Sequence, residues 1–371
     1  MSWRGFFCAI ALTAAIGGFA ACKPDPPIKL GFVGGLSGRV ADLGVSGRNG
    51  VMLAIEQRNA AGGIHGRLVT LIVRDDEQDP EVAKYVMEKL LQEQVEAVIG
   101  PMTSSMAMAM VPLANEAKTL LVSPTANAAE LTGLDDYYFR VVSDTRTNAE
   151  RIARFQFDQL GHRTAVVMYD LANKAYAESW LNDFRTEFEK LGGTIRATCT
   201  FVSGADTPYY DMVWELLEHD PDFALVIANS VDAALICQQI RKTNDELPIA
   251  LAEWAATERF IELAGSASNH IYVAHFIDRD DDSQQYQDFL AAYQQRFGQN
   301  PGFAGLAGYD AAQVVLEGLT RRSSGQSLKS TLLALGDFAG VQQRISFDRF
   351  GDTNRTAFFS VIRNGHYQAL E

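Results

Sequence analysis

Cysteine and histidine are scarce in this chain, which has four cysteines and six histidines among 371 residues. The closest histidines, His270 and His275, are five positions apart on a predicted strand, so they point to opposite faces and cannot share a metal ion. The sequence has no G-x-S-x-G nucleophile elbow and no G-x-x-x-x-G-K-[ST] phosphate loop. It therefore predicts no catalytic residue, no metal site and no cofactor.

The chain also has fewer basic residues than acidic ones. Against 46 aspartates and glutamates there are only 32 lysines and arginines, a formal net charge of -14. Because binding of a nucleic-acid backbone relies on clustered Lys and Arg, we expect no nucleic-acid partner. Hydrophobic residues make up 47% of the chain, enough to bury substantial cores, and the length suggests two domains.

The N-terminus differs in character from the rest of the chain. An apolar stretch at 5–21 follows Arg4 and is too short to span a bilayer comfortably, as in a secretory signal. It ends in FAAC, similar to a bacterial lipoprotein signal that leaves Cys22 as an acylated N-terminus. Phenylalanine stands where such signals usually have leucine, so cleavage after an alanine-rich site is the alternative. We expect 1–22 to be the signal and 23–27 to be an extended, proline-rich tether.

Two cysteines, Cys199 and Cys237, lie beyond this segment. In an oxidising compartment they could form a disulfide. Cys199 is in a predicted strand and Cys237 on a predicted helix, and nothing in the sequence brings their Cα atoms within the limit of roughly 7 Å. We expect two separate buried thiols, with the disulfide as the alternative.

Apolar β-branched runs alternate with amphipathic segments along the whole chain, which is typical of parallel sheets with crossover helices. The sequence thus predicts the α/β class. Predicted strands lie at 28–34, 68–75, 97–100, 120–123, 137–142, 164–170, 194–202, 223–229, 248–253, 270–276, 344–348 and 357–365. Predicted helices include 47–59, 80–92, 148–160, 177–191, 233–242 and 283–297.

Two of these strands end in hydroxyl-rich turns that open helices, in the segments 95–105 and 119–132. An apolar run followed by small polar residues directs backbone N–H groups, hydroxyls and a helix N-terminus to one place beyond the strand ends. The arrangement suits a small carboxylate.

These turns and the segments IKLGFVGGLSGRVADLG, NAAGGIHGRLVTLIVRDDEQDP, YDLANKAYAESWLNDF and LAEWAAT resemble the leucine/isoleucine/valine-binding proteins of bacterial branched-chain amino-acid ABC importers. The resemblance extends over nearly everything after residue 27. It implies a monomer of two doubly wound parallel-sheet lobes, joined by a three-segment hinge, with a ligand cleft between them. The implied lobes are 28–142 with 278–340, and 143–277 with 341–371. Asp75 and Asp76 recur in this family in a strand-to-helix turn, so we expect them to be structural.

A free amino acid needs donors for its carboxylate and an acceptor, best an ionised one, for its ammonium group. The resemblance implies that Ser104 and Thr125 contribute hydroxyl and backbone groups to the carboxylate. Asn127 stands where leucine-binding relatives have a threonine hydroxyl. Alternatively, Ser104 is an ordinary helix N-cap and Asn127 an Asx-turn or cap.

The second lobe is expected to supply the opposite half of the site. The resemblance implies that Tyr176 faces the cleft and that Glu253, at the end of an apolar strand, pairs with the ligand ammonium. Alternatively, Tyr176 packs against the sheet edge and Glu253 pairs with an Arg or Lys across the interlobe surface.

Met102, Leu43 and Trp254 are candidates for an apolar wall, although each could equally belong to the core. Asn229 follows a strand at a place where leucine-binding relatives have a tyrosine. Together with Asn127, it departs from the pattern of a strictly branched-chain site.

The implied mechanism is closure of the lobes on a ligand, with no bond made or broken, and recognition of the closed form by a membrane permease. We therefore expect a periplasmic or extracytoplasmic binding subunit for an apolar, branched-chain or aromatic L-amino acid, attached to the membrane only through the lipid on Cys22. The alternative is the same fold binding an aromatic acid, an amide or urea, for transport or as a ligand sensor.

Overall fold

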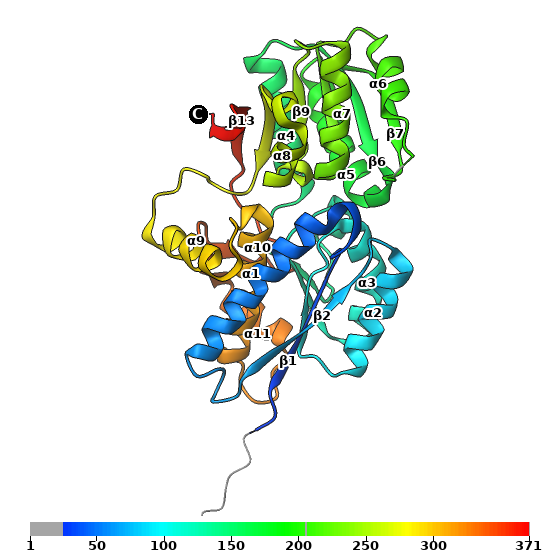
Figure 1. Cartoon of the computed structure of the whole chain (residues 1–371). Helices are drawn as coiled ribbons and strands as arrows, with labels where there is room; N and C mark the ends of the chain where they lie inside the picture. Colours follow the sequence, from blue (N-terminus) through cyan, green and yellow to red (C-terminus); the bar gives the residue numbers. More distant parts are fainter. Residues whose placement is uncertain (1–24, 205, 371) are drawn as a thin grey trace, which may run out of the picture.

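A computed structural model describes residues 25–204 and 206–370. They form two α/β lobes, one above the other in Figure 1, each built on its own sheet. The predicted signal at 1–22, with Cys22, lies outside the described residues. The predicted α/β class with two parallel-sheet lobes is confirmed.

The sheet of the first lobe has the order β2-β1-β3-β4-β5 and is parallel throughout. Its strands run over the predicted segments because each is a short apolar stretch bounded by turns. They are β1 (Ile28–Gly34), β2 (Val69–Asp75), β3 (Ala97–Ile99), β4 (Leu120–Ser123) and β5 (Tyr138–Arg140).

The sheet of the second lobe has the order β14-β13-β10-β9-β8-β6-β7. Five of its strands are parallel: β6 (Thr164–Asp170), β7 (Thr194–Phe201), β8 (Phe223–Ile227), β9 (Ile249–Leu251) and β10 (Ile271–His275). The remaining two, β13 (Phe358–Arg363) and β14 (His366–Ala369), form an antiparallel hairpin on the edge of β10. Its turn is Asn364-Gly365, both with positive φ, which suits a two-residue hairpin. The sheet of the second lobe is therefore mixed at this edge, whereas the prediction was a sheet that is parallel throughout.

The helices of the first lobe are α1 (Ala41–Ala60), α2 (Pro80–Gln92), α3 (Ser104–Ala117), α9 (Gln284–Phe297), α10 (Gly302–Arg321) and α11 (Leu328–Leu335). Those of the second lobe are α4 (Thr145–Arg154), α5 (Lys174–Lys190), α6 (Tyr209–Leu217), α7 (Ser230–Thr243) and α8 (Glu258–Ala264). The predicted helix at 148–160 begins three residues earlier, at Thr145, and its last part is a π-helical turn, η3 (Phe155–Gln159).

The predicted start of the first helix, at residue 47, is also wrong, since α1 begins at Ala41. The glycines of α1 made its start hard to predict from the sequence, because glycine is a poor helix former. A Cβ on Gly50 would lie 2.0 Å from the carbonyl oxygen of Gly305, so glycine there lets α1 and α10 pack backbone to backbone.

The division of the chain between the two lobes remains a proposal, and the structure suggests moving one of its boundaries. The two-stranded pair of β11 (Asp337–Phe338) and β12 (Ile345–Ser346) spans the boundary proposed between residues 340 and 341. Phe347 lies against Phe139, with ring centroids 5.1 Å apart, and Arg355 pairs with Asp310 at 2.9 Å. We therefore propose that the third crossing lies near residue 357.

The two cysteines of the described residues are both free, which confirms separate thiols. Cys237 is buried on α7, whereas Cys199 on β7 is only partly buried. No helix of the described residues has both the length and the apolar character needed to cross a membrane.

Candidate functional site

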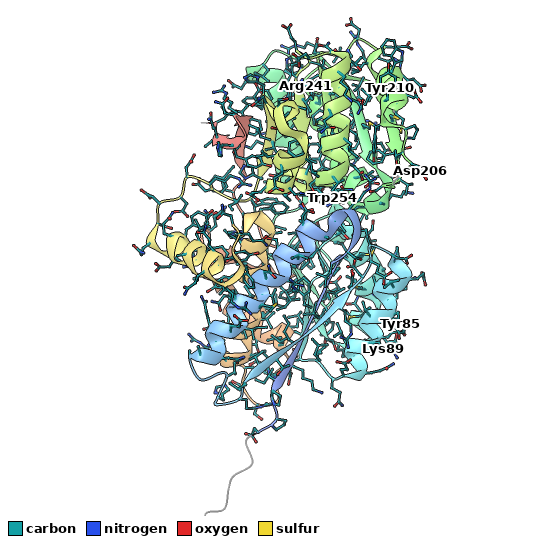
Figure 2. All side chains as sticks on the ribbon, viewed as in Figure 1. Tyr85, Lys89, Asp206, Tyr210, Arg241 and Trp254 are labelled. Atoms are coloured by element: carbon teal, nitrogen blue, oxygen red, sulfur yellow. The ribbon has the colours of Figure 1, made fainter. Side chains whose placement is uncertain are left out.

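A small cavity between the lobes brings most of the predicted site residues together. Its lining consists of Leu43, Met102, Thr103, Ser104, Thr125, Asn173, Tyr176, Glu253, Trp254 and Phe303. Figure 2 labels Trp254 at the junction of the two lobes. The cavity measures about 20 Å³, room for roughly one water molecule, so the lobes are closed on each other.

The first-lobe half of the site rests on the adjacent ends of β3 and β4. Ser104 is the first residue of α3, and its buried hydroxyl oxygen accepts hydrogen bonds from the backbone N–H groups of Asn127 and Ala128, both at 3.1 Å. The N-cap position belongs to Thr103, so Ser104 does not cap α3 with its side chain. The Thr125 hydroxyl donates to the Met102 carbonyl at 2.5 Å. Hydrogen bonds therefore connect the turn after β3 to the turn after β4.

The second-lobe half centres on Glu253, which follows β9 in the short helical turn η5 (Glu253–Ala255). Trp180 Nε1 donates to Glu253 Oε2 at 2.9 Å, and Asn127 Nδ2 lies 3.4 Å from Glu253 Oε1. Among the described residues no Lys or Arg forms an ion pair with Glu253, so the interlobe salt bridge considered as an alternative is not present there. Burial raises the pKa of the Glu253 carboxyl, while the hydrogen bond from Trp180 opposes the rise.

Several buried polar atoms beside Glu253 lack a hydrogen-bond partner within the described part of the chain. They are the Tyr176 hydroxyl, the Trp254 indole nitrogen and Asn127 Oδ1. The rings of Tyr176 and Trp254 meet edge to face, with centroids 5.7 Å apart. Burial raises the pKa of Tyr176 well above its usual range, so its hydroxyl keeps its proton. Because a buried unpaired polar group costs roughly 1–3 kcal/mol, this cluster suits a polar ligand.

Asn229 does not line this cavity. It is the N-cap of α7, and its side-chain oxygen accepts from the backbone N–H groups of Val231 and Asp232, both at 3.0 Å. Such caps satisfy helix N–H groups that have no partner within the helix. We therefore leave Asn229 out of the proposed ligand-binding set.

The sequence analysis missed four residues of the site: Thr103, Asn173, Trp180 and Phe303. The first three lie within segments that already carry site residues, so their proximity in sequence was an available signal. Phe303 lies in the first turn of α10, far along the chain, and had no such signal. Within the described residues, no group of three or more His, Cys, Asp or Glu could hold a metal ion.

The chain is similar to known proteins over nearly its whole length. Over 349 residues the chain is 23% identical to the leucine-, isoleucine-, valine-, threonine- and alanine-binding protein of Pseudomonas aeruginosa, covering 93% of this chain and 92% of that protein. It is similar to the branched-chain amino acid transporter substrate-binding protein LivJ of Streptococcus pneumoniae, solved in complex with isoleucine. That match has a TM-score of 0.84 and 27% identity, and covers 93% and 99% of the two chains.

A further structural neighbour is a solute-binding protein of an ABC transporter from R. palustris, solved in complex with benzoate. Its TM-score is 0.82 at 21% identity, with 93% and 95% of the two chains covered, which shows a shared fold. The sequence profile described as "Periplasmic binding protein" matches residues 27–366, nearly the whole chain. The chain therefore belongs to the periplasmic binding protein family.

Proposed function

We propose that this protein is the extracytoplasmic substrate-binding subunit of an ABC importer and binds a free L-amino acid that is apolar, branched-chain or aromatic. The observation that carries the proposal is the buried carboxyl group of Glu253, which receives only neutral donors from the protein. Burial of a carboxylate is costly unless a cation or enough hydrogen bonds compensate it. An ammonium group on the ligand would supply that cation.

The proposed ammonium position lies at Glu253, which supplies the charge, and at the Tyr176 hydroxyl, which lines the same cavity and is unpaired in the described part of the chain. Both oxygens can accept from the N–H donors of an ammonium group. A charged acceptor beside a neutral one favours a primary amine over a neutral ligand.

The carboxylate position is proposed to lie at Ser104 and Thr125. Ser104 opens a helix of 14 residues, whose N-terminus favours negative charge. Leu43, Met102, Trp254 and Phe303 line the remainder of the cavity and give it an apolar character. These walls suit the side chain of a hydrophobic amino acid.

Closure of the lobes is the proposed signal to the permease. A cavity of about 20 Å³ is too small for an amino acid, so the ligand must enter with the lobes further apart, and its walls must lie further apart than in this structure once it is bound. Residues from both lobes then complete the site as the cleft closes, and no covalent step takes place. The protein would act as a monomer, held at the membrane surface by lipid on Cys22.

The second candidate ligand is an aromatic acid, supported by the benzoate complex of the R. palustris neighbour and by the aromatic rings of Tyr176, Trp254 and Phe303 at the cavity. Such a ligand would satisfy the Ser104 side of the site but would leave Glu253 without a cation. The same fold could report a ligand to a signalling partner, and amides and urea are further candidates.

Thermal unfolding with matched ligand pairs tests the proposal. L-leucine is compared with 4-methylpentanoate, and L-phenylalanine with 3-phenylpropanoate, because each acid differs from its amino acid only by the missing amino group. A ligand at 100 times its Kd stabilises by about 2.7 kcal/mol. Stabilisation by the amino acid but not by its partner supports the proposal. Equal stabilisation by both, or by benzoate, acetamide or urea alone, would contradict the role of Glu253.

A further inference from the structure

A four-residue segment of the first lobe, 39–42, reaches the second lobe without lining the ligand cavity. The Arg39 guanidinium pairs with the carboxylate of Asp232 in the first turn of α7. Arg39 Nη2 also donates to the carbonyl oxygen of Gly204 at 2.7 Å. One side chain of the first lobe thus contacts two separate segments of the second.

Asp232 lies inside the second lobe among several hydrogen-bond donors. Its side chain is fully buried, yet it accepts hydrogen bonds from Tyr209 Oη at 2.7 Å, from Asn229 Nδ2 at 2.6 Å and from the Ser203 hydroxyl. These donors are neutral and belong to the same lobe. Among the described residues, Arg39 is the cation that pairs with Asp232, and it comes from the other lobe.

Asp42 makes the second connection, one helical turn further along the chain. Its Oδ2 accepts from the Ser230 hydroxyl at 2.7 Å and from the Thr257 hydroxyl at 2.8 Å. Ser230 is the first residue of α7 and Thr257 is the N-cap of α8. The carboxylate therefore lies at the N-terminus of α7, which favours negative charge, and accepts from a hydroxyl at the start of α8.

We propose that residues 39–42 form an interlobe clamp that stabilises the closed lobes independently of the ligand and thereby sets the ligand affinity. The contribution to affinity rests on the proposed binding function, whereas the contribution to closure does not. Opening the lobes would separate Arg39 from Asp232 and break the hydrogen bonds of Asp42, and water would replace these contacts, so the clamp contributes the difference between the contacts and hydration. The clamp thus favours closure, and a ligand that binds the closed lobes more tightly than the open ones gains affinity from it.

The closure half is tested by small-angle X-ray scattering of the ligand-free protein, using Arg39→Gln, Asp232→Asn and the double variant. Arg296→Gln is the control, because Arg296 pairs with Glu56 within the first lobe and has a half-exposed side chain. We expect a larger radius of gyration for the clamp variants than for wild type and the control. Arg39→Gln changes a partly exposed side chain, 26% accessible, so it tests the proposal even if Asp232→Asn fails to fold. Unchanged scattering of Arg39→Gln would overturn it.

The affinity half is tested by calorimetric titration of the same variants with L-leucine. We expect each single substitution to weaken binding about tenfold and the double variant to be no weaker than either single one, as for coupled partners. Independent, additive losses would contradict the clamp. L-phenylalanine is titrated in parallel; if wild type binds neither amino acid, the proposed ligand class is wrong, and the ligand-free scattering still decides whether the clamp holds the lobes.

Discussion

The side-chain amide of Asn127 reaches Glu253 across the closed cleft, with Nδ2 3.4 Å from Oε1. Asn127 follows a strand of the first lobe and Glu253 follows one of the second, so this contact exists only when the lobes are together. The same amide nitrogen donates to the Ser143 carbonyl at 3.0 Å, which holds the amide with its nitrogen toward Glu253. The contact thus ties the first lobe to the carboxyl group at one pole of the proposed amino-acid site.

Replacing Glu253 by Gln should selectively weaken the binding of amino acids. The substitution keeps the shape of the side chain and removes the charge, so a charge-assisted hydrogen bond worth roughly 1.5–3 kcal/mol is lost. Calorimetric titration with L-leucine and L-phenylalanine measures the effect. Because Glu253 is buried at a raised pKa, the variant should fold at least as stably as wild type at neutral pH. Undiminished affinity would refute the ammonium contact.

Replacing Trp180 by Phe should impair the site indirectly, through Glu253. The variant loses the N–H that donates to Oε2 but keeps a ring beside Phe184, whose centroid lies 5.9 Å from that of Trp180. That donor opposes the rise in the Glu253 pKa caused by burial, so its loss should raise the pKa further. Amino-acid binding should weaken by roughly 0.5–1.5 kcal/mol at neutral pH, and its loss in acid should begin at a higher pH. A pH series of titrations checks this. If binding is lost at the same acidic pH in the variant as in wild type, Trp180 contributes only to packing.

Replacing Asn229 by Ala should destabilise the second lobe through loss of the α7 cap. Removal of an N-cap costs roughly 0.5–2 kcal/mol, which urea unfolding can measure. Asn229→Ser, which retains a capping oxygen, should recover a substantial part of that loss. Equal loss in both variants would show that capping is not the main contribution of Asn229.

Replacing Asp76 by Asn should stabilise the protein above neutral pH. Burial raises the pKa of Asp76 from 3.8 to about 7, so the folded state binds this proton more tightly than the unfolded chain. Ionisation of Asp76 therefore lowers the free energy of unfolding. This loss is absent in acid, grows as the pH rises from about 4 to 7, and reaches its full size above that. Asparagine retains the oxygen that accepts from the Gln78 N–H at 2.9 Å. We expect a gain of roughly 1–3 kcal/mol at pH 8 that vanishes near pH 4, measured by urea unfolding. A gain of the same size at both pH values would point to another cause.

Much of the fold follows from local sequence patterns. Apolar runs bounded by turns placed the strands, because a buried parallel strand is apolar along its whole length. Asp75 acts as predicted in its strand-to-helix turn, where its Oδ1 accepts from the Leu36 and Glu77 N–H groups at 2.8 and 2.9 Å. The start of α1 was missed because its glycines serve close contact with α10, a requirement that no local propensity expresses.

Short-range chemistry along the chain accounts for the α/β alternation, the family resemblance and the two hydroxyl-rich turns, so all three can be predicted from the sequence. Which side chains meet depends on the folded arrangement of the two lobes. Glu253 contacts Trp180, 73 positions away, and Asn127, 126 positions away, while Asn229 turns instead to its own helix. Phe303 enters the cavity from α10, far from the turns in sequence. Contacts of this kind depend on how the two lobes close around their hinge, and that geometry is set by packing across the whole molecule.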